Sequence, residues 1–237
     1  ALSLRAYKGE LLAILGGNGT GKSTTMGLIS GVNRAYRGKV SVLGHAPQEV
    51  LSRVALLPQD PQTLFVKNTV IEDLLSVLDD QPKDKRKALA LQKAKLCELT
   101  ELLDRHPYDL SGGEQQRAAL CKVLLREPEV LLLDEPAAGM NEEESVQLSA
   151  FIRNIRDSRD LTIVIIDHHM DVIMSICDRV SVYRDGQYIG SGDTKDLDEA
   201  QLIKMMVGRE ITDVFPKLEA EIGDVVFEAK NIVRADN

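Results

Sequence analysis

The chain has 237 residues, 43% of them hydrophobic and 28% charged, a composition that is typical of globular proteins and excludes disordered and fibrous classes. Its 37 acidic residues outnumber its 29 basic ones, which gives a formal net charge of −8. That balance argues against a general nucleic-acid binder, since such a protein needs a basic face to meet phosphates. The longest apolar runs, such as 130–133 and 162–166, are far shorter than the ~20 residues of a membrane-spanning helix. We therefore expect a globular protein that neither crosses a bilayer nor binds nucleic acid.

The three cysteines, Cys97, Cys121 and Cys177, lie far apart in apolar segments. This spacing lacks the C-x-x-C pairs of metal or redox sites and is typical of reduced core thiols in a cytoplasmic protein. Charged residues interrupt the only apolar stretch near the start, so no signal peptide is expected there.

Strand patterns alternate with helical patterns along the chain. Short apolar runs predict strands at 10–15, 39–43, 54–57, 130–133, 161–166 and 179–183. Helical periodicity is found at 22–30, 142–156 and 198–207. This alternation predicts an α/β fold with a mostly parallel sheet that is covered on both faces.

A long helical pattern from about 69 to 126 interrupts this alternation and exceeds the length of a single crossover. It predicts a helical subdomain, about residues 65–128, inserted into one domain that spans residues 1–208. After Gly208 the chain changes character: Pro216 and Gly223 punctuate a polar linker, and 225–233 has a strand pattern. We expect 209–237 to be a linker plus an extra strand, either the start of a second domain or a substitute for a missing first strand.

The first motif that carries chemistry follows the strand predicted at 10–15 and matches G-x-x-x-x-G-K-[ST]. Glycines let consecutive backbone N–H groups point at an anion, and the following helix adds the positive end of its dipole. Lys22 would place a charge on the β- and γ-phosphates, and the Ser23 hydroxyl would bind Mg²⁺. The predicted ATP-binding residues are Gly16, Gly17, Asn18, Gly19, Thr20, Gly21, Lys22, Ser23 and Thr24.

Two carboxylates end the apolar strand at 130–133. In a parallel sheet this strand end lies near the phosphate loop, so Asp134 is expected to hold Mg²⁺ and Glu135 to act as general base on the attacking water. A local alternative is an ordinary strand followed by an acidic helix cap.

The segment Leu110-Ser111-Gly112-Gly113-Glu114-Gln115-Gln116-Arg117 is the most specific run in the chain. Its Ser and Glu form a capping-box pattern, and the helix start it predicts is a second anion-binding position. With the loop of Lys22 and the strand ending in Asp134 and Glu135, it resembles the nucleotide-binding domain of ABC transporters. The resemblance covers roughly residues 1–208.

That resemblance implies further roles. Gln59 matches the glutamine that contacts Mg²⁺ and the attacking water, so the expected metal ligands are Ser23, Gln59 and Asp134. His168 matches the histidine that reaches the γ-phosphate, which with Gln59 and Glu135 completes the expected catalytic set. The signature residues Ser111, Gly112, Gly113 and Glu114 would act on ATP held by a partner domain.

The resemblance also implies partners and a cofactor. Two such domains, identical or different, pair head to tail around two ATP molecules with Mg²⁺, and hydrolysis lets them separate. Because no span is predicted, the membrane permease subunits would be separate chains, an arrangement commoner among importers. We therefore expect an ATP-hydrolysing importer subunit on the cytoplasmic face of the membrane.

The chain departs from the family pattern at two positions. Asn141 stands where the family usually has an aspartate, and His169 stands where an aspartate commonly follows the histidine. Different segments resemble energy-coupling factor importers (57–75), branched-chain amino-acid importers (137–141) and tandem sugar importers (179–216), so no cargo is predicted. Two alternatives stay open: a non-transport ABC ATPase, and a nucleotide-dependent dimerisation module with little intrinsic hydrolysis.

Overall fold

A computed structural model describes residues 4–208 of the chain. Its centre is a six-stranded sheet in the order β2-β3-β4-β1-β5-β6. The first five of these strands run parallel to one another, and β6 pairs with β5 in the antiparallel direction. The strands are β1 (Leu11–Gly16), β2 (Val54–Leu57), β3 (Val130–Asp134), β4 (Thr162–Ile166), β5 (Arg179–Arg184) and β6 (Gln187–Asp193). The predicted α/β fold with a mostly parallel sheet is confirmed.

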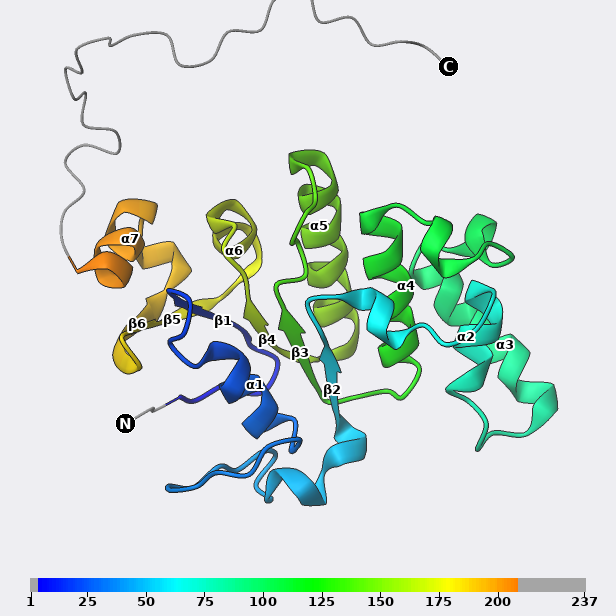
Figure 1. Ribbon diagram of the computed structural model, residues 1–237, viewed down its shortest axis with the longest axis horizontal. Helices are drawn as coiled ribbons and strands as arrows, with labels where there is room; N and C mark the ends of the chain where they lie inside the picture. Colours follow the sequence, from blue (N-terminus) through cyan, green and yellow to red (C-terminus); the bar gives the residue numbers. More distant parts are fainter. Residues whose placement is uncertain (1–3, 209–237) are drawn as a thin grey trace, which may run out of the picture.

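Helices cover both faces of this sheet (Figure 1). The helix α1 lies on one face, and α5 and α6 lie on the other. The helices are α1 (Lys22–Ile29), α2 (Val70–Ser76), α3 (Lys83–Leu96), α4 (Gly112–Leu124), α5 (Glu142–Arg159), α6 (Met170–Ile176) and α7 (Glu199–Val207).

Alternation of side chains along buried strands divides the core into two apolar layers. On β4, Ile163 and Ile165 pack with the layer under α4, α5 and α6, whereas Val164 and Ile166 pack with the layer that includes Met26 of α1. Every residue of β1 and β4 is buried, which explains why these strands lack polar alternation.

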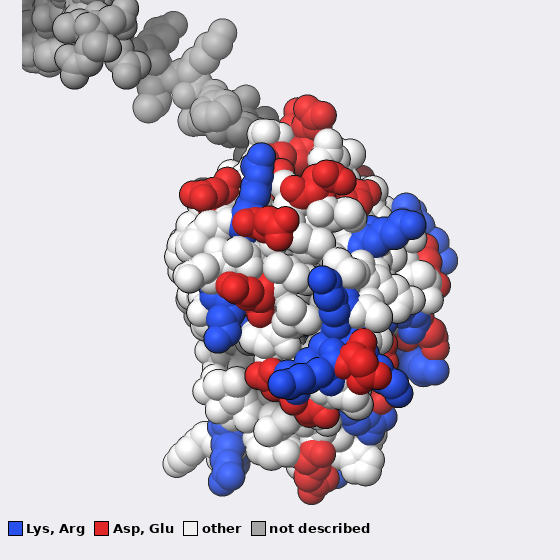
Figure 2. Space-filling model, turned by 90° about the vertical axis from the view of Figure 1, so that its right-hand side faces the viewer, with Lys and Arg blue, Asp and Glu red and all other residues white. Residues whose placement is uncertain are grey.

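The helices α2, α3 and α4 gather at the β2 end of the sheet (Figure 1). They occupy the part of the chain in which the sequence predicts an inserted helical subdomain. Figure 2 looks at this end and shows basic and acidic side chains interspersed over the surface.

The strand predicted at 39–43 is wrong. That stretch forms only an isolated bridge between Val42 and His45, beside turns at Gly38 and Gly44 whose φ angles are positive. Conversely β6, which lies at the sheet edge and contains two glycines, carries no apolar run that would have predicted it.

Two other expectations concern cysteines and membranes. Cys97, Cys121 and Cys177 are buried and free, as expected for core thiols. Burial raises the pKa of the Cys177 thiol, and a hydrogen bond with Cys97 together with burial raises that of Cys121.

Within residues 4–208, no helix combines the length and apolar character needed to cross a membrane. The strand predicted at 225–233 lies outside the described residues.

Candidate nucleotide site

The predicted site residues follow the carboxyl ends of four neighbouring parallel strands. The phosphate-loop motif follows β1, Gln59 follows β2, the two carboxylates close β3, and His168 follows β4. Since these strands are adjacent in the order β2-β3-β4-β1, their carboxyl ends meet at one edge of the sheet. In open α/β sheets this edge is where ligands bind.

The loop between β1 and α1 depends on glycine at defined points. A Cβ on Gly16 would lie 2.5 Å from the backbone oxygen of Tyr183 on β5, so no larger residue fits beside that strand. Gly19 and Gly21 have φ angles of 77° and 91°, which side-chain-bearing residues rarely adopt. Gly21 is also the N-cap of α1 and provides no side chain to occupy the helix start. The first N–H groups of α1 are therefore open to an anion.

Lys22 is folded back over this loop. Its Nζ donates to the carbonyl oxygens of Gly16 and Gly17 at 2.8 and 3.0 Å, and the residue is buried. Burial lowers the pKa of the Lys22 ammonium, while the nearby Glu135 and Asp134 carboxylates oppose this effect. The ammonium group is thus held by neutral carbonyls that a phosphate would outcompete.

Asp134 and Ser23 face each other across the loop. Burial raises the pKa of the Asp134 carboxyl, with a smaller contribution from neighbouring Glu135, whereas the hydrogen bond with Ser23 and the charge of Lys22 lower it. A hydroxyl and a half-buried carboxylate are hard oxygen donors that suit Mg²⁺, which completes its shell with water and phosphate oxygens. The residues present therefore fit this ion.

Glu135 is the centre of a three-residue cluster. Its carboxylate accepts a hydrogen bond from Gln59 Nε2 at 2.9 Å and lies 2.9 Å from His168 Nε2. The backbone is in the left-handed region, with φ of 47°, and its N–H donates to Ile166 of β4 at 2.8 Å. A non-glycine residue in this conformation is uncommon, and such strain is often found at functional sites. The structure thus brings the three predicted catalytic side chains together.

Asp167 was missed by the sequence analysis. It is buried, with 1% exposure, and its carboxylate accepts from the backbone N–H groups of His168 at 2.7 Å and Ala137 at 3.2 Å. It also lies 2.7 Å from Nδ1 of His169. Asp167 therefore fixes the turn that presents His168 and ties it to the segment after Glu135. Its position immediately after an apolar strand was the available signal.

The signature residues lie apart from this edge. Ser111 caps α4: its Oγ accepts from the Glu114 N–H at 3.3 Å, and Glu114 Oε2 accepts from the Ser111 N–H at 2.8 Å. Ser111 and Gly112 are exposed. Within residues 4–208, no hydrogen bond links Ser111 to the phosphate loop. The fold of one chain therefore leaves this helix start directed at the exterior.

Asn141 replaces the usual aspartate without loss of the local turn. Its Oδ1 accepts from the Glu144 N–H at 2.9 Å, and Glu144 accepts from the Asn141 N–H at 3.2 Å, which forms a capping box at the start of α5. Asparagine caps helices about as well as aspartate. Only the negative charge is lost.

Comparison with known proteins identifies the family. A family model described as ABC transporter matches residues 1–138. This chain belongs to the ABC transporter family. It has the P-loop NTPase fold.

Two curated relatives of this ABC domain are named as sugar import ATP-binding proteins. The ribose import ATP-binding protein RbsA of Bacillus subtilis is 33% identical over 241 residues, which cover 97% of this chain and 49% of the relative. The xylose import ATP-binding protein XylG of Photobacterium profundum is 33% identical over 248 residues, covering 98% and 48%. The chain thus spans about half the length of these relatives.

A solved structure has a similar fold. The protein cbiO1 of Clostridium perfringens, described as part of the ABC transporter complex cbiONQ, superimposes with a TM-score of 0.78 at 26% identity. The match covers 87% of this ABC domain and 86% of the other chain.

Proposed function

We propose that this ABC domain binds ATP with Mg²⁺ at the β1–α1 loop and hydrolyses it with Glu135 as the general base. The observation that carries the proposal is the convergence of Gln59 and His168 on the Glu135 carboxylate, at the sheet edge that holds the phosphate loop. A carboxylate held by two polar side chains is oriented for proton abstraction from a water molecule.

Each residue has a defined part in this reaction. The Lys22 ammonium group leaves the carbonyl oxygens of Gly16 and Gly17 and binds the β- and γ-phosphates instead. Ser23 and Asp134, with Gln59, would hold Mg²⁺, which when bound would supply positive charge to neutralise that of the transferred phosphoryl group. His168 contacts the γ-phosphate side of the site. Through its contact with the Glu135 carboxylate, it keeps that carboxylate oriented toward the γ-phosphate.

The domain works as a head-to-tail dimer, with an identical or a different partner domain. Support comes from the position of Ser111, which is an exposed N-cap of a 13-residue helix and does not contact the phosphate loop of its own chain. An open helix start attracts anions through its N–H groups and dipole. In the dimer, Ser111 to Glu114 meet the γ-phosphate bound by the partner, so hydrolysis removes the group that joins the two domains.

We further propose that this closing and opening powers solute uptake through separate permease subunits. The names of the relatives, which include ribose and xylose import ATP-binding proteins, support an importer. The description of cbiO1 as part of an ABC transporter complex supports association with other subunits. The domain would then lie on the cytoplasmic face of the membrane.

The deciding experiment measures the solution mass of the Glu135→Gln variant with and without ATP and Mg²⁺, by light scattering after size exclusion. The amide keeps the side-chain shape but cannot accept the proton, so the ATP-bound dimer accumulates. Adding Ser111→Arg should prevent this pairing, whereas Ser52→Arg, the same change at another exposed serine, should not. A monomer that binds ATP in all variants would refute pairing between identical chains, and a failure to bind ATP would refute the site itself.

A further inference from the structure

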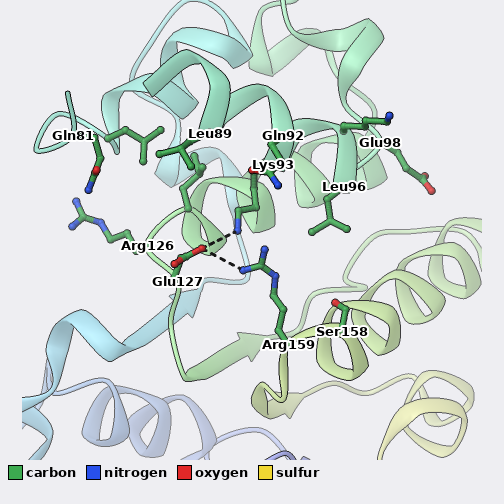
Figure 3. A pocket seen from close by; sticks show the side chains of 13 residues that line it. Gln81, Leu89, Gln92, Lys93, Leu96, Glu98, Arg126, Glu127, Ser158 and Arg159 are labelled. Atoms are coloured by element: carbon green, nitrogen blue, oxygen red, sulfur yellow. Dashed lines mark ion pairs between the residues drawn. The ribbon is translucent and has the colours of Figure 1, made fainter. Parts of the chain in front are cut away.

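A pocket lies at the opposite edge of the sheet from the nucleotide site. It has a volume of about 1020 Å³ and is bounded by α3, the segment 125–127 that follows α4, and the end of α5 (Figure 3). The segment 125–127 leads into the amino end of β3, and α5 ends just before the amino end of β4. The phosphate loop and Glu135 follow the carboxyl ends of the same sheet, so this pocket is spatially separate from them.

Lys93 of α3 contributes an unsatisfied charge to this pocket. Its side chain is only 8% exposed, and its Nζ has no hydrogen-bond acceptor within the described part of the chain. The nearest carboxylate is that of Glu127, at 3.9 Å, which is beyond hydrogen-bond distance. Burying an ammonium group without a bonded partner is costly, and burial is the main cause that lowers the pKa of Lys93.

Arg159, in the last turn of α5, approaches the same point. Its Nη1 lies 3.8 Å from the same Glu127 oxygen, and its charge further lowers the pKa of Lys93. Figure 3 shows Lys93 reaching toward Glu127 from above and Arg159 from below. Two cations therefore share one distant carboxylate, whose side chain is 76% exposed and free to swing outward.

The remaining walls supply apolar surface, two more cations, of which Lys95 is one, and a second carboxylate, that of Glu98. Leu78, Leu89, Leu96 and Leu125 line the pocket, together with Arg126. Sites for small molecules are typically about 300–1000 Å³, mostly apolar, with a few converging polar groups.

We propose that this pocket binds a small organic anion, whose carboxylate or phosphate group lies between Lys93 and Arg159 in place of Glu127 and whose apolar body contacts the leucines. The anionic group satisfies both cations with charge-assisted hydrogen bonds that Glu127 does not make at its present distances. Because the bound molecule contacts α3, the segment before β3 and the end of α5 at once, it braces the helical end of the domain against the sheet.

Calorimetric titration of the full chain tests this proposal. The probes are naphthalene-2-carboxylate, phenyl phosphate and the uncharged naphthalene-2-carboxamide, with saturating Mg²⁺ and ADP to fill the phosphate loop. We expect both anions to bind saturably and the amide at least tenfold more weakly, the difference expected for a charge-assisted contact. If only one anion binds, its anionic group, carboxylate or phosphate, identifies the chemical class of the natural ligand. No saturable binding of either anion, or equal affinity for the amide, overturns the proposal.

Matched variants place the binding at this pocket. Lys93→Met keeps the side-chain length and should weaken anion binding at least tenfold, whereas Lys87→Met, on an exposed lysine of the same helix, should not. Arg159→Gln should give a similar loss and guards against a folding defect in the first variant. The Lys93→Met protein should also melt at a higher temperature without ligand, because a buried charge has been removed. Unchanged affinity in both pocket variants would refute the assignment.

Discussion

Replacing Lys122 by Met gives a stringent test of how the helices α2 and α4 are held together. Lys122 lies on α4, and its Nζ is 2.6 Å from Asp73 Oδ1 of α2 and 2.5 Å from the carbonyl oxygen of Leu64. The Asp73 side chain is 2% exposed and that of Lys122 is 12% exposed, so this ion pair is buried. The two residues join α4, which begins at the signature, to the segment that follows Gln59.

The structure sets the size of the expected effect. Without the ammonium group, the donors left to the Asp73 carboxylate within residues 4–208 are the backbone N–H groups of Val66 at 3.0 Å and Lys67 at 3.3 Å. Breaking a buried pair by removing one partner typically costs about 3–5 kcal/mol, a large part of the ~5–15 kcal/mol that stabilises a domain. We expect the free energy of unfolding of Lys122→Met to fall by about that amount.

Urea denaturation, followed by far-ultraviolet circular dichroism, measures this change. The double variant Asp73→Asn/Lys122→Met should recover much of the loss, because no uncompensated charge then stays buried. Lys85→Met on exposed α3 surface is the control and should shift stability by less than about 0.5 kcal/mol. A cost below about 1 kcal/mol for Lys122→Met, or a double variant no more stable than the single one, would refute the reasoning.

Three further predictions concern the nucleotide site. Glu135→Gln should retain ATP binding but lower phosphate release about 10²-fold or more, as expected for a lost general base, and turnover at the parent rate would exclude that role. Lys22→Ala should abolish binding of a fluorescent ATP analogue in an equilibrium titration, because the phosphates lose their point charge; near-normal affinity would contradict the loop assignment. Burial raises the pKa of Asp134, so its contribution to stability is present at low pH and is lost as pH rises through the folded-state value. Asp134→Asn should therefore raise the melting temperature of the nucleotide-free protein at pH 7 by about 2–4 °C, with a smaller gain near pH 4. A lower melting temperature of the variant at pH 7 would instead show that the Asp134 charge stabilises the fold.

The sequence predicted the parts of the fold and site that depend on local patterns. The run of buried residues in β1, the glycines before Lys22 and the carboxylates after β3 are contiguous, so motif and periodicity suffice to identify them. Their meeting at one sheet edge follows from the rule that parallel strands place their carboxyl ends together.

Features that depend on the assembled sheet could not be predicted from local sequence patterns. The stretch 39–43 has strand-like residues, but the described part of the chain offers it no neighbouring strand, and a bridge forms at Val42 instead. Asp167 ties the turn at His168 to the segment after Glu135 through its contact with Ala137, which is 30 positions away in the chain. The pocket at Lys93 combines α3 with the end of α5, and no sequence pattern relates those two segments.

The pairing of β1 has a consequence for the order in which the domain is made. Leu11 pairs with Ile163 of β4, and Leu12 pairs with Arg179 of β5, so both partner strands that β1 has within residues 4–208 leave the ribosome after most of the domain. Contacts of such long sequence separation form late, because closing a long loop costs chain entropy before any pairing compensates for it. The nascent chain would therefore carry its phosphate loop unformed through most of synthesis, and nucleotide affinity would arise only when β4 and β5 enter the sheet.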